Sequence, residues 1–142
     1  MEKSKILFFL IIFLAVITRV PFLDGFPNGF SGDEASQGYT AYSILKTGRD
    51  EWGEFLPLNP RSFGDFKPPL YTYLTVPSVG LFGLSEGAVR LPSAIIGILT
   101  VIIVYFLTRE ILGLGEFFSE KERKAVSLLS AFLLAVSPWH IQ

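Results

Sequence analysis

The chain has 142 residues, half of them apolar, and its 12 basic and 13 acidic side chains give a net charge of −1. Because it has no cysteine and one histidine, a disulfide framework, thiolate chemistry and a histidine-rich metal site are excluded. There is no basic excess to neutralise the phosphates of a nucleic acid, so no nucleic-acid partner is expected. The apolar residues are gathered in blocks, which indicates an all-α integral membrane protein.

The first apolar block covers residues 6–23 and follows Lys3 and Lys5. Its length is close to the roughly 20 residues that a membrane-spanning helix needs, with Arg19 near its far end. A cleaved signal peptide has the same basic start and apolar core, but no small-residue cleavage site follows this block. We therefore expect a retained span, with the N-terminus in the cytoplasm because lysines favour that side.

Residues 24–86 separate the first two spans and are expected to lie outside the cytoplasm. As far as Pro69 the segment is polar, rich in Gly and Pro, and carries seven acidic, four basic and eight aromatic side chains. The aromatic residues argue against disorder. We expect an ordered loop with interfacial helices on the membrane surface.

Two helices are predicted within this loop. A helix over residues 33–47 is indicated by apolar residues at helical spacing, by a capping box of Ser31 with Glu34, and by Gly48 at its end. The apolar residues are Ala35, Tyr39, Tyr42 and Leu45. Residues 70–84 are apolar but short, and they contain Pro77 and Gly80, which favours an interfacial or re-entrant helix.

The second span is predicted over residues 88–110, because residues 91–107 are apolar and uncharged. Residues 113–124 carry Lys121, Arg123 and Lys124 and are expected to return through the cytoplasm. A third span is predicted from residue 125. Since the chain stops directly after this apolar run, we expect it to be the N-terminal part of a longer transmembrane domain.

The acidic pair Asp33 and Glu34 has two interpretations. Helix capping and the helix macrodipole account for carboxylates in a first turn without any catalytic role. In the second interpretation Glu34 caps the helix, while Asp33 points about 100° away from it. An ionised Asp33 facing a cleft could then act as a general base.

The local sequence pattern also leaves the roles of the two cationic candidates open. Lys67 precedes two prolines at the start of the predicted 70–84 helix and could bind the phosphate of a lipid head group, but interfacial snorkelling explains it as well. Arg90, at the outer end of the second span, has the same ambiguity. Tyr39 and His140 are possible site-lining residues, although His140 also fits an ordinary helix end.

Metal binding is not expected. Asp33, Glu34 and His140 make a conceivable but weak ligand set, so we predict no metal site and no cofactor.

Four short motifs occur in order along the chain. They are Arg19-x-Pro21, Gly32-Asp33-Glu34-Ala35, Lys67-Pro68-Pro69-Leu70-Tyr71 and Ala88-Val89-Arg90-Leu91-Pro92-Ser93. In this order the chain resembles the N-terminal part of the GT-C superfamily of membrane glycosyltransferases. It is most similar to the dolichyl-phosphate-mannose protein mannosyltransferase-like branch, which includes the lipid A aminoarabinose transferases. Ser137-Pro138-Trp139-His140 is similar to the end of the third span in many members.

The resemblance implies a multi-span helical bundle that transfers a sugar, with inversion, from a polyprenyl-phosphate donor outside the cytoplasmic membrane. Asp33 corresponds to the base that deprotonates the acceptor hydroxyl, and Glu34 to the second acid of the family pair. Lys67 corresponds to the lysine near the donor phosphate. Many relatives have an acid directly before that lysine, whereas this chain has Phe66 there and Asp65 one step earlier.

Two alternatives remain open at this point. One is an oligosaccharyltransferase-type GT-C enzyme that depends on a divalent metal. The other is a small non-catalytic membrane scaffold or interaction subunit with an ordered external loop.

Overall fold

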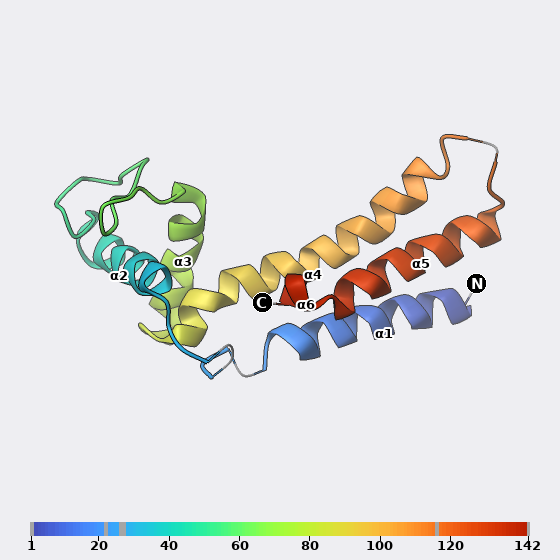
Figure 1. Cartoon of the computed structure of the whole chain (residues 1–142), viewed down its shortest axis with the longest axis horizontal. Helices are drawn as coiled ribbons and strands as arrows, with labels where there is room; N and C mark the ends of the chain where they lie inside the picture. Colours follow the sequence, from blue (N-terminus) through green and yellow to red (C-terminus); the bar gives the residue numbers. More distant parts are fainter. Residues whose placement is uncertain (1, 22, 26–27, 116, 142) are drawn as a thin grey trace. The chain divides into compact units, whose positions relative to one another are not determined.

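The computed structural model describes residues 2–21, 23–25, 28–115 and 117–141. Helices dominate these ranges: α1 (Glu2–Arg19), α2 (Gly32–Thr47), α3 (Pro69–Phe82), α4 (Glu86–Ile111), α5 (Glu120–Val136) and α6 (Pro138–Ile141), as Figure 1 shows. Extended pairing within the described ranges is limited to two isolated bridges, Arg49 with Phe55 and Arg61 with Phe66. The expected all-α class is confirmed for the part of the chain that the structure describes.

The chain divides into two compact units, one formed by residues 1–21 and 94–142 and the other by residues 22–93. In the first unit, α1, α5 and the greater part of α4 pack around small and branched side chains, and the ring of Phe8 lies 4.4 Å from that of Tyr105. The buried core residues are Ile11, Ala15, Val101, Tyr105, Leu128, Ala131 and Ala135. Buried alanines allow helix backbones to approach closely, as in membrane bundles.

Helix α5 begins at Glu120, before the apolar run that was expected to open at residue 125. The reason is a capping box. The Ser119 backbone N–H donates to the Glu122 carboxylate at 2.8 Å, and the Ser119 hydroxyl accepts from the Glu122 N–H. This box adds a charged first turn ahead of the apolar residues.

Among the described residues, one helix is long and apolar enough to cross a membrane, namely α4 with 26 residues. Pro92 lies inside α4 without ending it.

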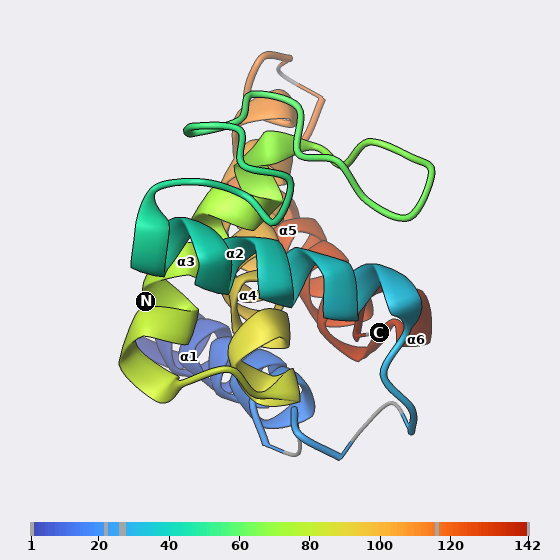
Figure 2. The ribbon, with the colours of Figure 1, turned by 90° about the vertical axis from the view of Figure 1, so that its left-hand side faces the viewer.

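The second unit is built on α2 and α3, which cross each other in Figure 2. The start and end of α2 are as predicted: Ser31 and Glu34 form the capping box, and Gly48 closes the helix with φ of 70°. Helix α3 begins at Pro69 and continues through Pro77. The predicted helix over 70–84 is therefore present, and its interfacial position stays a prediction.

The buried face of α2 differs from the apolar stripe that the sequence suggested. Tyr39, Tyr42 and Leu45 are exposed, and the buried residues are mostly small ones: Ser36, Gly38, Thr40, Ala41 and Ile44. Small side chains bring α2 close to its neighbours, which leaves the large residues on the outer face. Gly38 shows how close the packing is, because a Cβ there would lie 2.6 Å from Cγ2 of Val89.

We expect Gly38→Val to destabilise the second unit by about 1–3 kcal/mol, since the added side chain would overpack the contact with Val89. Proteolysis of the 49–67 segment in membrane vesicles should become faster. Gly32→Val is the matched control, because a Cβ at Gly32 meets no atom within 4 Å. Equal cleavage rates in the two variants would contradict this packing.

Candidate functional site

Asp33 and Lys67 are brought together from different elements of the second unit. Asp33 lies in the first turn of α2, and its Oδ1 is 2.9 Å from Lys67 Nζ. The Asp33 side chain is 73% exposed, whereas that of Lys67 is 14% exposed. Hydrogen bonding to Asp33, and secondly to Asp65, raises the pKa of Lys67, so its positive charge is secure at neutral pH.

The backbone before α3 sets the position of Lys67. Pro68 caps α3, and the Lys67 N–H donates to the Pro60 carbonyl at 2.9 Å. Asp65 accepts from the Phe66 N–H at 2.7 Å through one oxygen and from Lys67 Nζ at 3.1 Å through the other. The turn includes Gly64 with φ of 86°, a conformation that suits glycine. Asp65 therefore reaches the lysine although Phe66 stands directly before it.

Glu34 forms a second ion pair, with Arg90 in the first turns of α4. Arg90 Nε donates to Glu34 Oε1 at 2.7 Å and Nη2 to Oε2 at 3.3 Å. The same carboxylate completes the capping box through the Ser31 N–H at 2.9 Å. The hydrogen bond from Arg90 is the largest cause that lowers the pKa of Glu34, so the carboxylate is ionised at neutral pH.

Arg90 is buried, and its remaining donors hold the segment before α2. Nη1 donates to the Leu23 carbonyl at 2.9 Å and Nη2 to the Gly29 carbonyl at 2.7 Å. Glu86 lies 3.4 Å from Nη1, and the Phe30 ring centroid lies 5.7 Å from the guanidinium carbon. Arg90 thus joins α4 to the segment before α2 and to the first turn of α2. Nothing in the local sequence pattern indicates this role.

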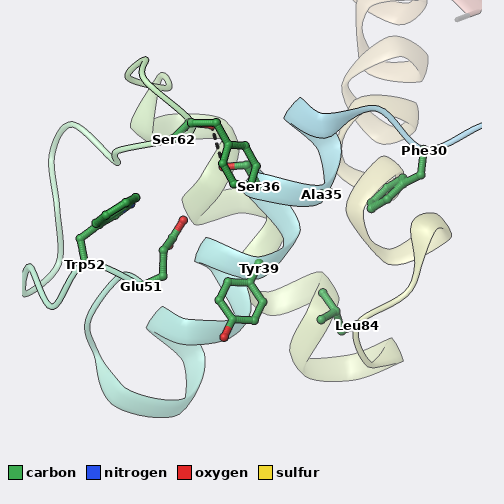
Figure 3. Close-up of a pocket in the computed structure, with 9 residues that line it drawn as sticks. Phe30, Ala35, Ser36, Tyr39, Glu51, Trp52, Ser62 and Leu84 are labelled. Carbon is green, nitrogen blue, oxygen red and sulfur yellow. Dashed lines mark hydrogen bonds between the residues drawn. The ribbon is translucent and has the colours of Figure 1, made fainter.

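Tyr39 lines an open groove of about 450 Å³ on the second unit. The other lining residues are Phe30, Ala35, Ser36, Glu51, Trp52, Ser62, Phe63 and Leu84 (Figure 3). The groove is mainly apolar, and Glu51 is the one charged side chain among the described residues that line it.

His140 belongs to the first unit, where its partner is Arg19. Arg19 Nη2 lies 2.7 Å from His140 Nδ1, and the guanidinium also donates to the Leu134 and Ala135 carbonyls at 3.2 and 3.1 Å. Because arginine only donates, Nδ1 accepts and the ring proton is assigned to Nε2. Arg19 is buried, with 4% of its surface exposed. In the sequence, the signal for this contact is the single charge at the end of the first apolar block.

Within the described ranges, no three His, Asp or Glu side chains gather in an arrangement that could hold a metal ion. Asp33 and Glu34 each face a cation. The absence of a metal requirement remains a prediction.

The comparisons with known proteins bear on the second half of the chain. Residues 66–141, more than half of the chain, match the family model described as dolichyl-phosphate-mannose-protein mannosyltransferase. The match includes Lys67, Arg90 and His140, and Asp33, Glu34 and Tyr39 lie before it. No curated protein and no solved structure gave a significant match. By this match the chain belongs to the dolichyl-phosphate-mannose-protein mannosyltransferase family.

Proposed function

We propose that the protein of which this chain forms part transfers a sugar from a polyprenyl-phosphate donor to an acceptor hydroxyl, with inversion, on the extracytoplasmic face of a membrane. Family membership supports a membrane glycosyltransferase with a lipid-phosphate donor. The observation that carries the assignment of this site is the 2.9 Å contact between Asp33 and Lys67, which places a base beside a cation.

Asp33 is proposed as the general base. In the transfer step the acceptor oxygen forms a bond to the anomeric carbon as the bond from that carbon to the phosphate oxygen breaks. The hydroxyl proton passes to the Asp33 carboxylate, and the polyprenyl phosphate leaves with the electron pair. Since Asp33 is largely exposed, an acceptor can reach it. General-base help of this kind typically contributes about 10²–10⁴-fold.

Lys67 is proposed to stabilise the departing phosphate, on which negative charge develops. It donates to both Asp33 and Asp65, so it can exchange one carboxylate for a phosphate oxygen and stay anchored by the other. The mechanism needs no metal or other cofactor.

Arg90 is proposed to position the site. The sequence leaves a phosphate-binding role open for Arg90, but in the structure the Arg90 guanidinium donates to Glu34 and to two backbone carbonyls. Through Glu34 it holds the first turn of α2, which carries Asp33. Tyr39 is proposed to line the site, and His140, which pairs with Arg19 in the first unit, is given no part in it.

The proposed topology is multi-pass, with spans at about residues 6–23 and 88–110 and from about 125, and with residues 24–86 outside. The exposed apolar residues of α1, such as Phe9 and Phe13, support a lipid-facing surface in the first unit.

Lys67→Ala in the full-length protein should lower kcat/KM for the donor by about 10²-fold, because one electrostatic contact to the leaving group is lost. KM for the acceptor should change less than about twofold. Kinetics at varied donor and fixed acceptor measure this difference. Lys46→Ala is the matched control, because it also removes a lysine from the second unit. The Lys46 Nζ lies 5.6 Å from the centroid of the Tyr42 ring. Unchanged donor kinetics in Lys67→Ala would remove this residue from the donor site.

A further inference from the structure

The first unit contains an open pocket of about 580 Å³. The start of α1, the end of α4 and the start of α5 form it, and these three segments lie at the same end of the first unit in Figure 1. The described residues that line it all belong to the first unit, whereas Asp33 and Lys67 belong to the second. The pocket is therefore a different site from the one that carries the proposed sugar transfer.

The charge of this pocket is positive. Lys5, Arg109 and Lys124 line it, and none of the described lining residues is acidic. The carboxylate of Glu120 stands beside two of these cations, at 2.8 Å from Arg109 Nη2 and 2.9 Å from Lys124 Nζ. Glu120 also pairs with Arg123. Because one carboxylate is shared among three cations, positive charge is left over for an anion in the pocket.

Aromatic rings line the pocket beside these cations. They are Phe8, Phe9, Tyr105 and Phe106. The Phe8 ring packs on Tyr105 at 4.4 Å and on Phe106 at 5.8 Å, which joins α1 to α4. Phe9 and Phe106 are more than half exposed, so their rings offer an apolar surface to a ligand.

Along both helices the charged and apolar groups follow the order of a phospholipid. Lys5 precedes Phe9 by four residues on α1, and Arg109 follows Phe106 by three on α4, so each pair shares one helix face. Since α1 begins and α4 ends here, each cation lies nearer the end of the unit than its ring. The rings lie where the uncharged run of α4 ends, in a helix long enough to cross a membrane. The cations therefore match the depth of lipid phosphates, and the rings match that of acyl chains.

This combination restricts the ligand. A free phosphate or a nucleotide would use the cations and gain little from the exposed rings, while an uncharged lipid would use the rings and leave the positive charge unmatched. Basic pockets between membrane helices on the cytoplasmic side suit anionic lipid head groups. The proposed topology places this end of the first unit in the cytoplasmic leaflet.

We propose that this pocket binds one anionic phospholipid. Its phosphate lies among Lys5, Arg109 and Lys124, and the upper part of an acyl chain lies against Phe9 and Phe106. The lipid links α1, α4 and α5 at one end of the first unit. This binding site goes beyond the proposed sugar transfer and does not depend on it.

Native mass spectrometry of the full-length protein in an uncharged detergent tests the site, with phosphatidylglycerol as the probe. At a lipid concentration that fills the wild-type sites, the double variant Lys5→Ala with Lys124→Ala should retain one phosphatidylglycerol molecule fewer. The expected weakening at this site is about 30-fold, because two lysines beside the anionic head group are lost. Arg109 and Arg123 still pair with Glu120 in this variant, which preserves the contacts between the helices.

Two further double variants separate lipid recognition from general effects of charge and folding. Lys3→Ala with Lys121→Ala is the matched control, because it removes the same charge from the same two helices at exposed positions that do not line the pocket. It should retain the lipid. Lys5→Arg with Lys124→Arg keeps the charge of the pocket and should retain it as well.

Three results would overturn the proposal. One is equal retention of phosphatidylglycerol by the Lys5 and Lys124 alanine variant and by the Lys3 and Lys121 control. Another is equal retention of phosphatidylcholine and phosphatidylglycerol by the wild type, because the cations would then have no part in recognition. The third is displacement of phosphatidylglycerol by millimolar inorganic phosphate, which would assign the pocket to a free anion instead of a lipid.

Discussion

Asp33→Asn in the full-length protein should lower the rate of sugar transfer by at least about 100-fold, because asparagine cannot accept the acceptor proton. The loss should appear in kcat, with donor and acceptor KM changed much less. Transfer of a radiolabelled sugar from a polyprenyl-phosphate donor measures it, and protease protection checks that membrane insertion is unchanged. Because the Asp33 side chain is 73% exposed, the substitution leaves no unpaired group in the core.

Asp65→Asn is the matched control for this experiment. Both aspartates pair with Lys67, at 2.9 and 3.1 Å, and both are about equally exposed. The two substitutions therefore remove the same charge from the same lysine. A loss of transfer confined to Asp33→Asn identifies the base, whereas equal losses would show that the effect acts through Lys67. Sugar transfer at the wild-type rate by Asp33→Asn would contradict the assignment of Asp33 as the general base.

The local features of the second unit could be predicted because short-range contacts produce them. Ser31 and Glu34 bond across a single helical turn, and Gly48 adopts the left-handed conformation that ends α2. The same serine-to-glutamate signature occurs at Ser119 and Glu122, and it starts α5 at Glu120, five residues before the apolar run that hydropathy alone indicates.

The tertiary contacts could not be predicted from spacing alone. Arg90 and Glu34 are 56 residues apart, and no periodicity indicates that α4 meets the first turn of α2. The buried face of α2 was also hidden, since its large apolar residues stay exposed and small ones such as Gly38 form the contact. The groove depends on a loop whose fold follows from turns and buried prolines. The residue types therefore indicate which side chains could form the site, whereas the tertiary fold determines which of them are in contact.

Arg90→Met should lower the free energy of unfolding of the second unit by about 3 kcal/mol, since it leaves Glu34 without its charged partner in a largely buried pair. Proteolysis of the 49–67 segment in membranes should accelerate accordingly. Arg109→Met is the control at the other end of α4, because its 2.8 Å pair with Glu120 is more exposed and contributes little to stability. A raised donor KM with unchanged proteolysis would instead favour phosphate binding by Arg90.

The same ion pair predicts a dependence on pH. Arg90 holds the pKa of Glu34 below its ordinary value of 4.5, so the folded state favours the ionised carboxylate. The stability from this pair is therefore fully present above pH 4.5 and is lost as the pH falls through the lowered pKa. Glu34→Gln should remove this part of the acid sensitivity, measured as the pH at which proteolysis of the 49–67 segment accelerates. An unchanged acid transition in Glu34→Gln would mean that Arg90 holds the site through the Leu23 and Gly29 carbonyls alone, so that Glu34 contributes the helix cap and no positioning of Asp33.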